Sequence, residues 1–182
     1  MRGPVLLKVL LASICCLIIS TALSRAESIT HSHRVELEVE KELPGVRVDE
    51  RAVSEVVYTL IDNAAKYSRA GSTIRITARR SGDGILEMGV EDEGPGIPAD
   101  LRERVFDKFF RATRDGDIRK SQPKGTGMGL AIARGIVEAH YGKIWIEPGH
   151  DGKGTRVLFT LPIGDDDVIE ESRYTATTVE VQ

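Results

Sequence analysis

The stretch DEGPGIP at positions 92–98 places a carboxylate beside two glycines and two prolines, directly after a strand-like run. A carboxylate at a strand end can accept a hydrogen bond from an exocyclic amine. Gly94 and Gly96 lack a Cβ atom, so a flat ring can approach the backbone there. The same residue types are also common in plain turns that end a strand. Taken alone, the stretch predicts either a ligand site or an ordinary turn.

A second group of polar residues lies on a predicted helix at 49–68, which Asp49 can cap and Gly71 follows. Asn63 falls at the border of the apolar face, with Lys66 three residues later. An amide oxygen there can ligate a hard cation, and an ammonium group one turn away can meet a phosphate. The alternative is a solvated helix face. The residues opposite the apolar face are Glu55, Thr59, Asp62 and Lys66.

A third group consists of Gly125, Gly127 and Gly129, which alternate into a predicted helix at 128–140. A glycine-rich entry leaves N–H groups exposed at a helix N-terminus, which favours an anion. The pattern is not a Walker A loop, because no Gly-Lys-Ser/Thr ends it, and no strand precedes it as in a dinucleotide fingerprint. It therefore predicts a phosphate-binding helix entry of another type.

The elements that must position these groups are strands and helices in alternation. A short helix is predicted at 101–112, where closely spaced phenylalanines indicate a packing anchor, and the nearly apolar-free segment 113–124 predicts a long mobile loop. A glycine-rich hairpin turn is predicted at 81–84. The predicted strands begin at Arg34 and cover 72–80, 84–94, 143–147 and 154–163.

The 182 residues allow one ordinary domain with flanks, and the net charge of −3 gives no case for a general nucleic-acid binder. Arg2 and Lys8 precede an apolar run at 9–23 that is shorter than the roughly 20 residues of a membrane span. Residues 1–26 therefore resemble a signal peptide or short anchor; the alternatives are a buried helix or a mis-assigned start.

The two ends of the chain differ in composition from the middle. Residues 164–182 contain six acidic residues and one arginine, which predicts a solvated, disordered tail. The folded domain is predicted at 32–163. Cys15 and Cys16 are adjacent in the apolar run, so they have neither disulfide nor metal-ligand spacing.

The ordered set of motifs resembles the ATP-binding catalytic domain of sensor histidine kinases, a superfamily shared with DNA gyrase, a heat-shock chaperone and a mismatch-repair ATPase. The set is an Asn on a helix, DxGxG after a strand, a phenylalanine-rich helix, a polar lid and GxGxGL opening a helix. The run GLAIARGIVEAHYGKIWIE looks most like osmosensing potassium-uptake sensor kinases. The resemblance implies an α/β two-layer sandwich, with helices on one face of a mixed, mostly antiparallel sheet.

The resemblance implies a role for each motif position. Asn63 ligates Mg²⁺ and acts with Thr59 and Lys66 in catalysis, while Asp92 reads the adenine amine. Phe106 and Phe109 anchor the lid, and Arg111 reaches toward phosphate. The implied ATP-binding residues are Asn63, Lys66, Tyr67, Asp92, Gly94, Gly96, Ile97, Phe109, Arg111, Gly125, Thr126, Gly127, Met128, Gly129 and Leu130.

Two departures from the family pattern bear on activity. Thr59 stands where the family usually has a second Asn, which puts the rate of phosphoryl transfer in doubt more than ATP binding. None of the four histidines has the context of the phospho-acceptor box, and His140 near a helix end indicates a structural or exposed role. The acceptor histidine is therefore expected in another chain, with a response regulator downstream.

Three functions follow from these expectations. The first is a histidine kinase catalytic domain, the second a nucleotide-binding regulatory module without transfer activity, and the third a serine kinase of the anti-sigma type. Because kinases of this type usually dimerise through a hairpin missing here, a monomer is expected. An ATP site predicts a cytoplasmic domain, whereas the charges around the apolar run favour the outside; association with the inner membrane through residues 5–23 is the alternative.

Overall fold

The computed structural model describes residues 14–43, 45–82, 84–111 and 126–164. These residues form a five-stranded sheet in the order β1-β2-β3-β5-β4. Its strands are β1 (Arg34–Val39), β2 (Thr73–Arg80), β3 (Ile85–Asp92), β4 (Ile144–Pro148) and β5 (Thr155–Pro162). The helices are α1 (Ile14–Thr30), α2 (Glu50–Tyr67) and α3 (Gly129–Ala139), with short 3₁₀ turns η1 (Ala99–Leu101), η2 (Arg104–Phe106) and η3 (His150–Gly152).

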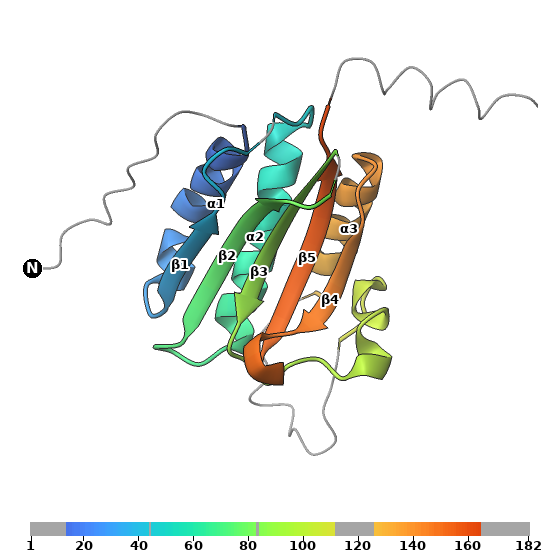
Figure 1. Cartoon of the computed structure of the whole chain (residues 1–182). Helices are drawn as coiled ribbons and strands as arrows, with labels where there is room; N and C mark the ends of the chain where they lie inside the picture. Colours follow the sequence, from blue (N-terminus) through green and yellow to red (C-terminus); the bar gives the residue numbers. More distant parts are fainter. Residues whose placement is uncertain (1–13, 44, 83, 112–125, 165–182) are drawn as a thin grey trace, which may run out of the picture.

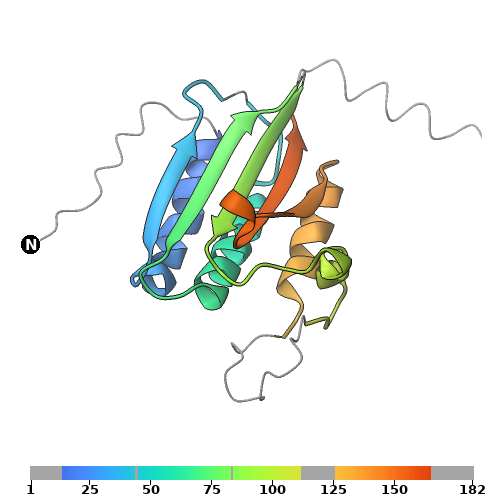
Figure 2. The same ribbon diagram turned by 60° about the horizontal axis from the view of Figure 1, so that its bottom comes forward.

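The three α-helices form one layer behind the sheet, as Figure 1 shows. Strand β1 is parallel to β2 across the α2 crossover, and every other neighbouring pair is antiparallel. Among the described residues the other face of the sheet carries no α-helix, and only the short turn η3 lies at its end (Figures 1 and 2). This arrangement confirms the predicted two-layer α/β fold with a mixed, mostly antiparallel sheet.

The core lies between the helices and one face of the sheet, because residues of period two on the strands meet the apolar stripe of α2. Ile74, Ile76 and Ala78 of β2 are fully or almost fully buried on that face. They alternate with polar residues that face away from the helices. Asp49 caps α2 by accepting the Ala52 N–H at 3.0 Å, so the predicted helix start is confirmed.

Helix α1 belongs to this core, which corrects the predicted domain start at residue 32. Cys15, Ile18 and Ala22 are completely buried, and α1 packs along α2. Arg25 reinforces the contact, because its guanidinium pairs with Glu55 at 2.7 Å. Residues 14–23 of the apolar run that resembled a leader lie in this buried helix, as in the alternative interpretation, and the signal-peptide or anchor role of residues 1–26 stays a prediction.

The predicted helix at 101–112 is wrong in its form. The chain makes the two 3₁₀ turns η1 and η2 instead, Asp107 is extended, and Phe109 has a φ of 66° in the left-handed region. These backbone conformations interrupt helical hydrogen bonding. The predicted mobile loop at 113–124 and most of the predicted tail lie outside the described residues.

In the described part of the chain, no helix has both the length and the hydropathy required for a membrane span.

Candidate functional site

Three of the predicted motifs meet at one edge of the sheet. The C-terminal ends of α2 and β3 and the N-terminal end of α3 all lie at the lower edge of the view in Figure 1. Figure 2 brings this edge forward and shows the segment that contains η1 and η2 beside α3. Polar groups from three elements that are distant in the sequence are therefore gathered at this end of the sheet.

Asp92 is the last residue of β3 and is only 8% exposed. One carboxylate oxygen, Oδ1, accepts the backbone N–H of Gly94 at 2.7 Å and that of Thr155 at 3.3 Å. Among the described residues, no donor reaches the second oxygen, Oδ2. The carboxylate is thus held in one orientation with one acceptor left for a ligand.

Burial raises the pKa of Asp92 from 3.8 to about 6, because a desolvated carboxylate disfavours its charged form. The hydrogen bonds from Gly94 and Thr155 oppose this rise, and the nearby Glu91 charge adds to it. The Asp92 side chain is therefore still ionised at neutral pH, but the burial of its charge destabilises the folded state. A perturbed group in a cleft is typical of functional sites.

The glycines after β3 allow a close backbone approach. A Cβ at Gly94 would lie 2.8 Å from the Tyr67 carbonyl oxygen, and Gly96 has a φ of 75°. A Cβ at Gly154, which precedes β5, would lie 1.8 Å from the Asp92 carbonyl oxygen. Real side chains do not fit such gaps, so the turn before β5 closes directly onto the end of β3.

Residues of α2 line the same edge. The Thr59 methyl group contacts α3 at Gly129, where a Cβ would come within 3.1 Å. Lys66 forms an ion pair with Asp62, one turn before it. The side-chain amide of Asn63 makes no hydrogen bond within the described residues, so its oxygen is available to a cation. This helix therefore supplies an amide and a paired ammonium beside the start of α3.

The phenylalanine-rich segment is joined to the glycine-rich entry of α3. The left-handed Phe109 donates its N–H to the carbonyl oxygen of Gly127 at 2.9 Å. Phe106 is buried, as predicted for an anchor, and Phe110 packs against the core. The Phe109 side chain is 71% exposed, so the expected packing role belongs to Phe110 instead. An exposed aromatic side chain here is free to contact a ligand.

Arg134 of α3 fastens the same segment from the other side. Its guanidinium pairs with Glu103 at 2.7 Å and with Glu138 at 2.8 Å, and it lies over the Phe106 ring at 5.8 Å. Both carboxylates raise the pKa of Arg134, which stays charged. The η2 turn is therefore held against α3 by charge as well as by burial.

The N-terminus of α3 has no side-chain cap in the described residues. Met128 is its N-cap residue, and Gly127 before it has a φ of 70°. The first N–H groups of an uncapped helix are good anion donors, so this end suits a phosphate. Gly125 lies outside the described residues.

The comparisons with known proteins agree with this geometry. A family model described as "Histidine kinase-, DNA gyrase B-, and HSP90-like ATPase" matches residues 48–165. The chain belongs to this family. It is a histidine kinase-type ATPase domain, and ATP is the ligand that the family name indicates.

Curated relatives similar to this chain include several adaptive-response sensory kinases SasA. The protein from Synechococcus sp. (strain JA-3-3Ab) is 38% identical over 153 residues, covering 84% of this chain and 38% of its own length. The one from Nostoc sp. (strain PCC 7120 / SAG 25.82 / UTEX 2576) is 37% identical over 134 residues, covering 74% of this chain and 32% of its own. The chain thus spans about a third of the length of these kinases, and the osmosensing subfamily stays a prediction.

Solved structures of histidine kinases match the fold. The mycobacterial sensor histidine kinase MprB superposes with a TM-score of 0.68 at 29% identity, covering 81% of this chain and 93% of that one. The catalytic domain of histidine kinase ThkA gives a TM-score of 0.69 at 27% identity, covering 83% and 95%. These superpositions cover almost all of the two solved chains.

The ATPase domain brings most of the predicted site residues to one edge. Tyr67 ends α2 with a half-exposed side chain, Ile97 follows the glycine turn, and Arg111 follows Phe109. Thr126, Met128 and Leu130 surround the start of α3. Whether each contacts ATP stays a prediction.

Sequence reasoning missed two residues of the ATPase site, Gly154 and Thr155. Their signal was a Gly-Lys-Gly-Thr stretch before a strand, which is also an ordinary turn. His140 has the structural role expected: its Nε2 accepts the Asp49 N–H at 3.0 Å and its Nδ1 donates to the Ile136 carbonyl at 2.8 Å. It links the end of α3 to the start of α2.

Proposed function

We propose that this domain binds Mg²⁺-ATP at the described edge and transfers the γ-phosphoryl group to a histidine on an acceptor helix. The observation that carries the proposal is the Asp92 carboxylate, which is buried, oriented by two backbone N–H groups and left with one acceptor oxygen. An adenine amine satisfies that oxygen, and the glycines beside it admit a flat ring.

The triphosphate then extends from the base toward the uncapped N-terminus of α3, where N–H groups favour anions. Lys66 pairs with Asp62 in the structure, and a rotation of its side chain away from Asp62 brings the ammonium group toward the phosphates. A Cβ at Gly127 would meet the Phe109 backbone at 2.9 Å and one at Gly129 the Thr59 methyl group at 3.1 Å, so these glycines let the neighbouring segments pack against the start of α3. In this direction the base binds at Asp92 and the phosphates bind at the start of α3.

The site fits Mg²⁺ through Asn63. Its amide oxygen is unpartnered in the described residues, and Mg²⁺ is usually held by one or two protein oxygens together with substrate phosphates. The described residues contain no cluster of three or more histidine, cysteine or acidic side chains suited to a metal, so the phosphates must complete the shell. The ion neutralises charge on the phosphates during transfer.

The acceptor histidine, in this proposal, belongs to a separate phospho-acceptor domain, and a response regulator receives the phosphoryl group next. The SasA and MprB kinases named above motivate this expectation. The domain contributes positioning and charge neutralisation and needs no covalent nucleophile. Its own residues bind the base, hold the phosphates and orient the γ-phosphoryl group.

A second candidate is a nucleotide-binding module with little transfer activity. Thr59 favours it, because its methyl group faces Gly129 and a threonine hydroxyl is shorter than the asparagine amide usual in the family. In that case ATP binds normally, but the group that positions the transfer is weakened. Both candidates require the same nucleotide site.

Binding is tested by titration calorimetry of the full chain with Mg²⁺-ATP, beside Asp92→Ala and Asn63→Ala. We expect saturable binding that Asp92→Ala abolishes, and that Asn63→Ala weakens with Mg²⁺ present but not with EDTA. The exposed Asp100→Ala, in the same loop, is the matched control and leaves binding unchanged. Absence of binding by the folded wild-type chain overturns both candidates.

Transfer is tested by adding an isolated acceptor domain of a related kinase and following labelled phosphohistidine. A histidine kinase labels the acceptor, and Thr59→Asn accelerates the labelling without changing ATP affinity. A regulatory module binds ATP but labels nothing. If Thr59→Asn then creates labelling, the missing activity is assigned to that position.

A further inference from the structure

We propose that Glu91, on the open face of the sheet, is a positioning residue for base recognition by Asp92 on the opposite face. Neighbouring residues of a strand point to opposite faces, so Glu91 itself lies outside the nucleotide site. It acts through the turn between β4 and β5, which it holds against the sheet. This inference rests on the proposed function, because it assigns a role within the same site.

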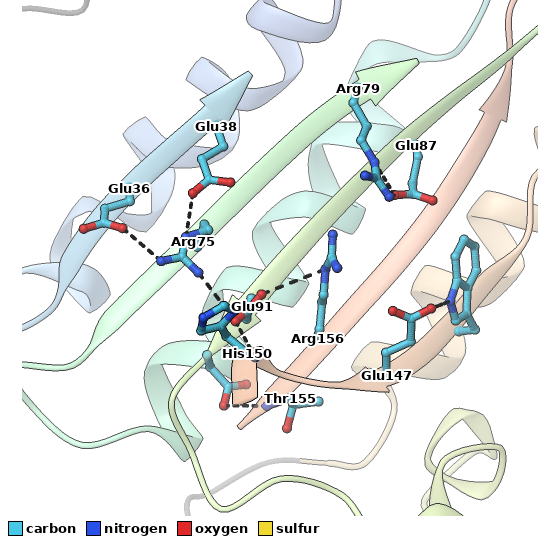
Figure 3. A network of polar contacts seen from close by, with 12 residues as sticks. Glu36, Glu38, Arg75, Arg79, Glu87, Glu91, Glu147, His150, Thr155 and Arg156 are labelled. Carbon is cyan, nitrogen blue, oxygen red and sulfur yellow. Dashed lines mark hydrogen bonds and ion pairs between the residues drawn. The ribbon is translucent and has the colours of Figure 1, made fainter. Parts of the chain in front are cut away.

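The Glu91 carboxylate is the centre of a polar network on the open face, shown in Figure 3. Its Oε1 accepts the backbone N–H of His150, the first residue of η3, at 2.9 Å. Arg75 approaches Oε1 at 3.6 Å and Arg156 approaches Oε2 at 3.9 Å. The side chain is only 14% exposed, and the two guanidinium groups lie on either side of this largely buried carboxylate.

The turn between β4 and β5 links the bond at Glu91 to the orientation of Asp92. Gly149 donates its N–H to the Gly154 carbonyl at 3.3 Å, which closes the turn on itself. Gly154 lies directly against the Asp92 backbone, and the next residue, Thr155, donates its N–H to Asp92 Oδ1. The two adjacent acids of β3 therefore hold the two ends of one turn, Glu91 at its start and Asp92 at its finish.

The residues on either side of the turn, Pro148 and Thr155, are paired between β4 and β5, but few contacts of the described residues hold η3 itself. None of the η3 residues is buried, and the His150 side chain is 80% exposed. A cavity of about 330 Å³ lies between the turn and the strand ends, lined by Thr73, Glu91, His150 and Lys153 among others. Because apolar packing is absent from η3, the bond to Glu91 has a large share in holding it.

Loss of this bond has a specific consequence. When the turn shifts, the Thr155 N–H leaves Oδ1, and Asp92 is then held by Gly94 alone. The carboxylate rotates more freely, so the bond to the adenine amine weakens. Within the described part of the chain, no hydrogen bond or ion pair joins this turn to the groups on α2 and α3 that are proposed to bind phosphate, so these groups stay as they are. A defect in positioning therefore reduces discrimination between bases rather than nucleotide binding in general.

The experiment measures the affinities of the full chain for ATP and for ITP, whose base has a carbonyl oxygen in place of the amine. Glu91→Ala removes the acceptor, and Glu91→Gln keeps an acceptor oxygen without the charge. Glu87→Ala is the matched control: Glu87 is on the same strand and face, is similarly buried and pairs with Arg79 at 2.7 Å. Circular dichroism confirms that each variant is folded at the assay temperature.

His150→Pro breaks the same bond from the donor side without touching Glu91. Proline has no N–H and is favoured at the first position of a helical turn, and the preceding Gly149 is extended, as proline requires. This variant keeps the inference testable if Glu91→Ala fails to fold. Combining the two substitutions should add no further loss, since both remove one bond.

We expect Glu91→Ala and His150→Pro to weaken ATP binding about tenfold, as the loss of one oriented hydrogen bond does, with ITP binding unchanged. Glu91→Gln retains most of the selectivity, and Glu87→Ala retains all of it. Equal weakening of ATP and ITP, or equal loss in Glu87→Ala, overturns the inference while leaving the proposed function intact. A wild-type chain that does not distinguish ATP from ITP overturns the base-reading role of Asp92 and this inference with it.

Discussion

Asp92→Asn should stabilise the nucleotide-free domain while weakening its affinity for ATP. The asparagine oxygen can still accept the N–H groups of Gly94 and Thr155, so the local structure is kept. The substitution removes a charge that burial disfavours. The new amide nitrogen, however, takes the place of Oδ2 and faces the adenine amine, so two donors oppose each other. Replacing this one oxygen atom by nitrogen therefore raises the stability of the domain and lowers its affinity for ATP.

The size of the stabilisation follows from the pKa of Asp92. That pKa is raised from 3.8 to about 6, so the folded state holds the proton more tightly than the unfolded state. The Asp92 contribution to stability is therefore greatest below pH 3.8 and is lost as the pH rises through 6. The difference of about two pH units corresponds to about 3 kcal/mol at neutral pH.

The assay is urea unfolding of wild type and Asp92→Asn at pH 4.5, 6 and 7.5, with ATP binding by calorimetry at pH 7.5. Other acids cancel in the difference between the two proteins. That difference should grow with pH toward about 3 kcal/mol in favour of the variant. ATP affinity should fall by about 10- to 100-fold, the contribution of a hydrogen bond to a charged group. A difference that is flat with pH, or a variant less stable than wild type at pH 7.5, would show that the Asp92 charge does not destabilise the folded domain.

Three further substitutions test the architecture. Gly154→Ala should unfold the sheet edge, because its Cβ would lie 1.8 Å from the Asp92 carbonyl oxygen at the end of β3. Gly152 has a φ of 74° and open space around it, so Gly152→Ala should cost only about 1 kcal/mol in thermal unfolding. Ile18→Ala in α1 should cost about 2–4 kcal/mol in urea unfolding, and the half-exposed Leu17→Ala less than about 0.5 kcal/mol; equal effects would contradict the burial of α1. His140→Ala should cost about 1 kcal/mol by removing the acceptor for the N-cap N–H of α2. Its ATP affinity, measured by calorimetry, should stay at the wild-type value.

The sequence predicted those parts of the site whose chemistry is local. Asp92 with its glycines, Asn63 on a helix and Gly127 before another helix each have a short-range signal that survives without knowledge of the fold. Thr155 and Glu91 could not be found in this way, because their roles depend on strand pairings between distant residues. Their types alone are ordinary for a strand.

The remaining errors also have physical causes. A short apolar run suits a leader and a buried helix equally well; in the structure residues 14–23 of the run lie in α1, where Ile18 is buried and the helix packs along α2. The spacing of Phe106, Phe109 and Phe110 suits a helix, but the left-handed backbone of Phe109 breaks it in favour of a bond to Gly127. Tertiary contacts overrode the local preference at both places.

The pairing of β3 with β5 has a consequence for how the domain folds. Asp92 and Thr155 are 63 residues apart, whereas β2 and β3 are joined by a short turn. Contacts between distant residues require a larger loss of chain entropy and form late relative to local hairpins. The carboxylate is therefore oriented only after the two ends of the sheet have met. Nucleotide binding should consequently appear with the final, slow phase of refolding, and a nascent chain that has not yet emerged beyond residue 155 should have no base-reading site.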